Sequence, residues 1–247
     1  MIQAVLFDTF GTVVDWRSGV VRDVAAFAGR HGLSLDAERL AADWRGLYQP
    51  AMENVRSGRR EFVPLDQLHL ENLRLVLEAH AVPRSWISEA EVNWLNGAWQ
   101  RLDPWPDSVP ALTSLKEHLV VGALSNGNVS LLVRLAKHAG LPWDVVAGSD
   151  LSRAYKPDPR AYRFAAQLLD LAPEEVMLCA AHNSDLAAAR AVGFRTAFVP
   201  RRTEHSGHQT QDLAPEQDWD VVVEDLRELP SRLAAEHRSP VPSSSGG

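Results

Sequence analysis

The segment at residues 4–12 reads AVLFDTFGT and sets the architecture of the chain. Its four apolar residues are typical of a strand that is buried on both faces of a parallel sheet. The run stops at Asp8, which places a carboxylate at the carboxyl end of that strand. Later apolar runs that also stop at polar or turn residues lie at 119–124, 145–148, 176–181, 196–199 and 220–223.

Helical patterns separate these runs. Asn128 and Gly140 are typical N-cap and stop residues around one apolar stripe. Asp158 followed by Pro159 predicts a second helix start, and residues 185–192 are rich in alanine. This alternation predicts an α/β fold with a doubly wound, Rossmann-like parallel sheet.

Residues 16–99 differ from the rest of the chain because they show helical stripes and no convincing strand run. We therefore predict a helical cap domain at 16–99, inserted into a core domain formed by residues 1–15 and 100–230. Residues 231–247 end in a segment rich in Ser, Pro and Gly, for which we predict a disordered tail.

The composition excludes several classes of protein. Twenty-five Lys and Arg against 32 Asp and Glu give a net charge of −7 among 247 residues. This acidic balance argues against a nucleic-acid partner and against a membrane surface that needs clustered basic residues. No apolar run reaches the ~18 residues that span a bilayer, and the single Cys179 cannot form an internal disulfide. We expect a cytoplasmic protein.

Polar side chains gather at the predicted strand ends, where open α/β sheets bind their ligands. Asp8 can be a nucleophile or a turn cap, and Lys156 can face Asp8 or lie in a solvated loop. Ser125 and its neighbours can bind an anion or simply cap a helix. The polar residues expected at this edge are Asp8, Ser125, Asn126, His182, Asn183 and Asp185, with Lys156 from a loop.

Four segments in this order resemble the motifs of the haloacid dehalogenase superfamily: DTFGT at 8–12, LSNG at 124–127, YKPDP at 155–159, and Asp185. The helical insertion resembles its cap. Phosphatases of this superfamily carry a second Asp two residues after the nucleophile, where this chain has Phe10. They also hold Mg²⁺ with several carboxylates, whereas only Asp185 is acidic in the AAHNSD segment at 180–185. These differences favour dehalogenation without a metal or other cofactor.

The chain is similar to the type II L-2-haloacid dehalogenases, in particular to a subgroup with an AAHN motif and fluoroacetate-active members. The resemblance implies that Asp8 displaces the halide from a short 2-haloalkanoic acid and that water hydrolyses the resulting ester. It implies catalytic roles for Asp8, Thr12, Lys156, Asp185 and Asn183; binding of the substrate carboxylate by Ser125, Phe10 and Thr9; halide binding by Arg45, Asn126 and His182; and support from Tyr162.

Some features leave alternatives open. His182 stands where type members of the family carry Asn, so it can donate to the halide, orient water or merely fill hydrogen bonds. Turnover of fluoroacetate beside chloro- and bromoacetate is therefore a hypothesis. Arg45 can also be a plain surface arginine, and we interpret residues 201–212, with Glu204, His205 and His208, as a polar loop rather than a metal cluster.

Other functions fit the same fold. A Mg²⁺-dependent phosphatase or phosphonatase is the first alternative, and a catalytically idle binding protein is the second. The resemblance also suggests a homodimer.

Overall fold

A six-stranded parallel sheet forms the centre of the chain, in the computed structural model that describes residues 1–206 and 209–236. Its strand order is β5-β4-β1-β6-β7-β8, and each neighbouring pair is parallel. The sequence prediction of a doubly wound sheet is confirmed. The strands are β1 (Ala4–Phe7), β4 (Val120–Ser125), β5 (Val145–Gly148), β6 (Val176–Ala180), β7 (Arg195–Phe198) and β8 (Val221–Val222).

The register of the three central strands brings their carboxyl ends level. Phe7, the last residue of β1, pairs with Ala123 of β4 and with Cys179 of β6. Asp8 therefore follows β1 at a height within one residue of the ends of β4 and β6. Side chains from the loops after all three strands meet at this edge of the sheet.

Helices cover both faces of the sheet, because successive strand side chains point to opposite sides. Val5 and Phe7 belong to the apolar cluster on one face, and Leu6 belongs to the cluster on the other. The first cluster contains residues of α6 (Ser108–Lys116), α7 (Val129–Ala139) and α11 (Leu229–Glu236); the second contains residues of α9 (Pro159–Leu168) and α10 (Asn183–Ala191). Short helices α8 (Ser149–Ser152), η3 (Pro173–Glu175) and η4 (Leu226–Glu228) complete this part.

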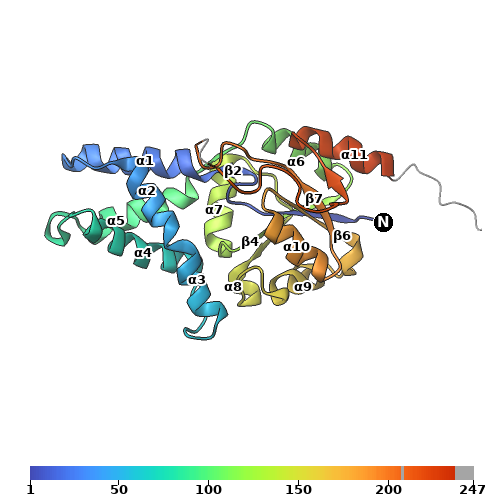
Figure 1. Cartoon of the computed structure of the whole chain (residues 1–247), viewed down its shortest axis with the longest axis horizontal. Helices are drawn as coiled ribbons and strands as arrows, with labels where there is room; N and C mark the ends of the chain where they lie inside the picture. The colour runs from blue at the N-terminus through green and yellow to red at the C-terminus, as the bar shows by residue number, and fades with distance from the viewer. Residues whose placement is uncertain (207–208, 237–247) are drawn as a thin grey trace, which may run out of the picture.

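Five α-helices and two short 3-10 helices form the cap. The five α-helices gather on the opposite side of the molecule from the helices that cover the sheet (Figure 1). Trp16, Trp44 and Trp99 are almost completely buried in this cap region, where the Trp99 ring contacts the rings of the other two. The elements are α1 (Trp16–His31), α2 (Ala37–Gly46), α3 (Tyr48–Arg56), α4 (Leu65–Ala79), η1 (Arg84–Trp86), α5 (Glu89–Asn96) and η2 (Gly97–Gln100).

The two connections between cap and core run side by side. Strands β2 (Val14–Asp15) and β3 (Asp103–Pro104) form a short antiparallel ladder that sequence patterns did not predict. Each strand has only two residues, so neither carries a detectable periodicity. Next to the ladder, the Trp105 indole donates to the carbonyl of Gly11 at 2.9 Å, which fastens the returning chain to the loop after β1.

Two local expectations need correction. Helix α11 continues to Glu236 with Leu233 buried, so residues 231–236 are not part of a tail; residues 237–247 lie outside the described residues. Asn128 occupies the N-cap position of α7, but its side chain makes no cap bond there. Its Oδ1 instead accepts from the Asp66 backbone N–H at the start of α4, which joins core and cap.

Candidate active site

A cavity of about 510 Å³ lies between the carboxyl edge of the sheet and the cap. Core residues Asp8, Lys156 and His182 line it from one side, and Arg45 and Tyr48 line it from the cap. Residues from the four predicted motifs and from the predicted cap thus face the same cavity.

Asp8 lies at the centre of this edge with 7% of its surface exposed. Its Oδ1 accepts from the Lys156 ammonium at 2.9 Å, and its Oδ2 accepts from the Thr12 hydroxyl at 2.9 Å. His182 Nδ1 lies 3.1 Å from the same Oδ2. Burial alone would raise the pKa of Asp8, but the charges and hydrogen bonds of Lys156 and His182 outweigh it and hold that pKa well below its usual range.

Lys156 connects the two acidic motifs. Its Nζ contacts Asp8, the Asp185 carboxylate at 2.5 Å and the carbonyl of Leu124 at 3.0 Å. The other Asp185 oxygen accepts from the Tyr162 hydroxyl at 2.6 Å. Burial would lower the pKa of Lys156, but the two carboxylates have the larger effect and raise the pKa above its usual value. The ammonium therefore stays charged between them.

Glu204 is the site residue that sequence reasoning missed. Its Oε2 lies 3.0 Å from His182 Nε2, and its Oε1 accepts from the Trp16 indole at 2.8 Å. Only 2% of this side chain is exposed. Gly11 makes room for it: a Cβ at that position would lie 2.2 Å from Glu204 Oε1, and the backbone has a φ of +88°.

A signal for Glu204 does exist in the sequence, because it follows β7 and polar residues after parallel strands tend to meet at the ligand edge. The polar loop that we predicted at 201–212 therefore contains a buried acid. His208 of that segment lies outside the described residues.

The His182 imidazole is held between two carboxylates, Asp8 and Glu204. Burial would lower the pKa of His182, but the charge of Glu204 and the hydrogen bond to Asp8 raise it well above its usual value. In turn, burial would raise the pKa of Glu204, and the charge of His182 brings it below its ordinary value. At neutral pH Asp8 and Glu204 are therefore carboxylates, and His182 between them is an imidazolium.

The residues expected to bind the substrate carboxylate are buried near the cavity. The Ser125 hydroxyl accepts from the Gly127 backbone N–H at 3.2 Å, and Asn126 Oδ1 accepts from the Lys156 backbone N–H at 2.7 Å. Of the residues expected to bind the substrate carboxylate, Phe10 lines the cavity and Ser125 and Thr9 do not, whereas Asn126, expected to bind the halide, lines it. Thr9 is fully buried, and its hydroxyl has no hydrogen-bond partner among the described residues.

The structure separates Asn183 from the other predicted catalytic side chains. Its Nδ2 donates to Asp212 and to the Ala214 carbonyl, and its Oδ1 accepts from the Glu216 backbone N–H and the Trp219 indole. These contacts use the amide's two donors and both acceptor positions. Asn183 therefore fastens the segment at 212–219 and does not line the cavity.

Arg45 lines the cavity from the cap side. Its guanidinium carbon lies 4.0 Å from the Tyr48 ring centroid and 5.1 Å from the Trp16 ring centroid. Its Nη1 is buried and has no hydrogen-bond partner among the described residues. Contact with aromatic faces keeps the guanidinium in place and leaves Nη1 available for an anion.

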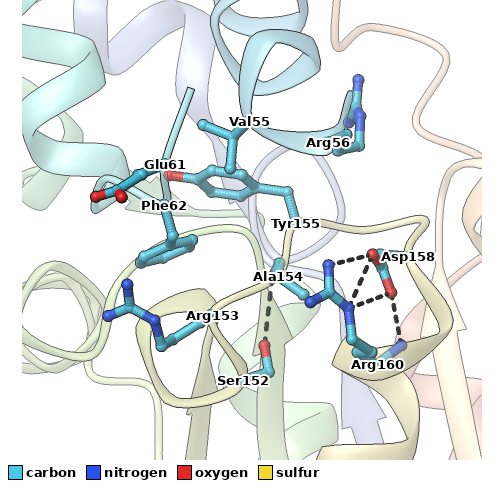
Figure 2. Close-up of a pocket in the computed structure, with 10 residues that line it drawn as sticks. All are labelled: Val55, Arg56, Glu61, Phe62, Ser152, Arg153, Ala154, Tyr155, Asp158 and Arg160. Atoms are coloured by element: carbon cyan, nitrogen blue, oxygen red, sulfur yellow. Dashed lines mark hydrogen bonds and ion pairs between the residues drawn. The ribbon is translucent and has the colours of Figure 1, made fainter. Parts of the chain in front are cut away.

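A second hollow of about 560 Å³ lies beyond Arg56, which lines both cavities. Figure 2 shows its Arg160 folded back onto Asp158, which accepts from it at 2.7 Å. Arg160 is exposed, so this pair is a solvated surface contact. Nothing there matches the buried charges around Asp8, and we place the active site in the first cavity.

The part of the chain that the structure describes offers neither a metal cluster nor a membrane-spanning helix. No group of three or more His, Cys, Asp or Glu side chains there is arranged to hold a metal ion. No helix among the same residues combines the length and the apolar character needed to cross a membrane. Cys179 is buried in β6, and burial raises the pKa of its thiol.

Comparison with known proteins agrees with this geometry. The family model of haloacid dehalogenase-like hydrolases matches residues 2–193. (S)-2-haloacid dehalogenase 1 of Pseudomonas sp. (strain CBS-3) is 30% identical over 94% of this chain and 96% of its own.

Two solved structures are also similar. That of the defluorinating L-2-haloacid dehalogenase Rha0230 is 54% identical, with a TM-score of 0.93 over 94% of this chain and 95% of that one. That of the L-2-haloacid dehalogenase of Xanthobacter autotrophicus with chloropropionic acid covalently bound is 27% identical, with a TM-score of 0.78 over 95% and 99% of the two chains. The chain therefore belongs to the haloacid dehalogenase-like hydrolases, in the family of the (S)-2-haloacid dehalogenases.

Proposed function

We propose that this protein hydrolyses the carbon–halogen bond of short (S)-2-haloalkanoic acids, with Asp8 as the nucleophile. The observation that carries the proposal is the position of Asp8, a buried carboxylate that is paired with the Lys156 ammonium and lines the cavity. A desolvated carboxylate can attack carbon directly, because no hydration shell has to be removed first.

The first step is a displacement. An oxygen of Asp8 attacks the carbon that bears the halogen, the carbon–halogen bond breaks, and the halide leaves with the bonding electron pair. Thr12 and Lys156 orient the attacking carboxylate through their hydrogen bonds. Arg45, Asn126 and His182, which all line the cavity, stabilise the departing halide.

The second step is hydrolysis of the ester. Water attacks the carboxyl carbon of Asp8 and the 2-hydroxy acid leaves, which restores the carboxylate. In this proposal Asp185 and Tyr162 hold Lys156 in place. Ser125, Thr9 and Phe10 surround the substrate carboxylate.

Binding also involves the cap. We propose that residues 16–99 act as a unit over the core and exclude water during the displacement. A homodimer, which light scattering can measure, is part of the proposal.

The residues present do not fit a magnesium centre. The Lys156 ammonium lies between Asp8 and Asp185, so both carboxylates already have a cationic partner. Phe10, at the position of a phosphatase's acid, is 3% exposed and packs edge-on against Trp99. These contacts favour dehalogenation over phosphate transfer.

Halide release from chloro-, bromo- and fluoroacetate in excess chelator tests the proposal, with p-nitrophenyl phosphate as the control. We expect chloride and bromide release without added metal and no phosphate release. We also expect fluoride release, because an N–H donor such as Arg45 Nη1, which has no hydrogen-bond partner among the described residues, suits a small, hard anion. Phosphate release that requires Mg²⁺, with no halide release, would overturn the proposal.

A further inference from the structure

We infer that His182 is the general base for hydrolysis of the Asp8 ester: its imidazole takes a proton from the attacking water. Glu204 holds the imidazole in position and balances its charge. The inference rests on the proposed function and deepens it. His182 acts on the reacting atoms, whereas Glu204 acts through His182 as a positioning residue.

The geometry places the imidazole beside the carbon that water must attack. His182 Nδ1 lies 3.1 Å from Asp8 Oδ2, and the side chain keeps 25% of its surface exposed. His182 lines the cavity together with Asp8, so a water there can contact both. On its other side Nε2 points to Glu204, which is fixed by Trp16. A base oriented by a buried acid is a common arrangement for proton transfer.

The Asp185 carboxylate is less suited to this task. One of its oxygens contacts Lys156 and the other accepts from Tyr162. If Asp185 took a proton from water it would lose its charge, and with Asp8 esterified the buried Lys156 ammonium would have no anionic partner unless the site rearranged. His182 needs no such rearrangement, because ester formation itself frees its Nδ1.

Ester formation also changes the charge around His182. In the free enzyme the carboxylates of Asp8 and Glu204 both face the His182 imidazole. The charges of Arg45, on the cap, and His205, on the neighbouring loop, lie near Glu204. Lys156 contacts Asp8 on the side away from His182 and also contacts Asp185. Esterification removes the negative charge of Asp8. The pKa of His182 then falls because only one of its two facing carboxylates remains, and its Nδ1 proton can leave to solvent with the halide.

The remaining protons balance as follows. Neutral His182 takes one proton from water as the hydroxide oxygen bonds to the Asp8 carboxyl carbon, forming a tetrahedral oxyanion. Collapse of this oxyanion breaks the bond to the alkyl oxygen, and His182 gives its proton to the leaving alkoxide of the 2-hydroxy acid. The new Asp8 carboxylic acid then passes its proton to His182. One proton and one halide are released per turnover.

The Glu204→Gln variant tests the inference, because it keeps the size of the side chain and removes its charge. Rapid mixing with chloroacetate should give one equivalent of chloride at close to the normal rate, followed by turnover slowed about 100-fold. Intact mass spectrometry should then find the chain carrying one carboxymethyl group.

The rate of ester hydrolysis, measured in single turnovers at a series of pH values, shows whether Glu204 positions His182 or has a merely structural role. The loss of the Glu204 charge should move the acid limb of ester hydrolysis to lower pH, because it lowers the pKa of His182. The matched control is Asp23→Asn, which neutralises another buried carboxylate, on cap helix α1, where Asp23 is paired with Arg101. This control should hydrolyse the ester at the normal rate.

The outcomes distinguish this inference from the proposed function. Absence of halide release by the unaltered protein would overturn the proposed function. Normal turnover by folded Glu204→Gln without ester, or loss of the chloride burst itself, would overturn the inference alone. If Glu204→Gln does not fold, His182→Gln serves instead, and because His182 also assists departure of the halide, the rates of ester formation and ester hydrolysis are measured separately. The inference requires ester hydrolysis to slow more than ester formation, and normal ester hydrolysis would contradict it.

Discussion

The two sides of the active-site cavity are built differently. On the core side, the charged groups of Asp8, Lys156 and Asp185 contact one another. The cap holds several buried polar atoms that lack hydrogen-bond partners among the described residues, among them Arg45 Nη1, both ring nitrogens of His69, Asn72 Nδ2 and Trp99 Nε1, whereas near the core side of the cavity Thr9 Oγ1 is in this state. Buried polar groups are normally paired, so this contrast is informative.

The difference indicates a division of labour. The core side is preorganised, because its hydrogen bonds fix the nucleophile before any substrate arrives. The cap side holds its polar groups by ring contacts, such as His69 stacked on Trp99 with centroids 4.3 Å apart. We therefore expect changes in the core to affect chemistry and changes in the cap to affect binding and stability.

Asp8→Asn should have the largest effect. Removal of the nucleophilic oxygen should lower halide release on the order of 10⁴-fold or more, as for other covalent nucleophiles. The measurement is halide release from chloroacetate, with circular dichroism to verify folding. Substantial halide release by the folded variant would show that the paired core groups are not the chemical machinery.

Lys156→Met should come next. It leaves Asp8 and Asp185 buried without their shared cation, so we expect activity to fall on the order of 10³-fold and stability to fall by about 3–5 kcal/mol. Urea unfolding measures the second effect. Lys116→Met is the control, because its pair with Asp144 is more than one third exposed and should contribute less than about 1 kcal/mol. Equal losses in the two variants would contradict the distinction.

Arg45→Lys tests the cap side. The charge is kept but the fixed fork of donors is lost, so we expect kcat/KM for chloroacetate to fall about tenfold with little change in unfolding. Arg39→Lys on the same helix, which is exposed, should change neither quantity. If Arg45→Lys lowered activity as much as Lys156→Met does, Arg45 would contribute to the chemistry in the same way as the core groups.

His69→Phe should have the smallest effect and the opposite sign. It removes two buried nitrogens without partners and should stabilise the fold by about 1 kcal/mol at pH 7. Burial and the nearby Arg45 hold the pKa of His69 well below its usual value, so only the unfolded chain takes up its proton as pH falls. The gain should therefore grow from pH 7 to pH 5.

Urea unfolding at the two pH values measures the gain from His69→Phe. His80→Phe is the control, because that ring lies 2.8 Å from Asp43 and should stabilise nothing when replaced. A loss of stability in His69→Phe would mean that the cap nitrogens do have partners.

The same division explains what the sequence could predict. The core site follows from local signals, since each apolar run ends in a polar residue and parallel register aligns the ends, as at Asp8 and His182. Glu204 and Asn183 were harder, because their roles depend on how the loops at 201–206 and 212–219 fold back. The cap helices were predicted from periodicity, but which of their polar atoms would be buried without partners depends on tertiary packing.

The most direct test of the central claim, that Asp8 is a covalent nucleophile, is one turnover of chloroacetate in water enriched in ¹⁸O with enzyme in excess. The account predicts that ¹⁸O enters the peptide that contains Asp8 and that the hydroxyl of the product carries the ordinary isotope. Appearance of ¹⁸O in the product hydroxyl, with none in that peptide, would mean that water attacks the substrate directly and would contradict the account.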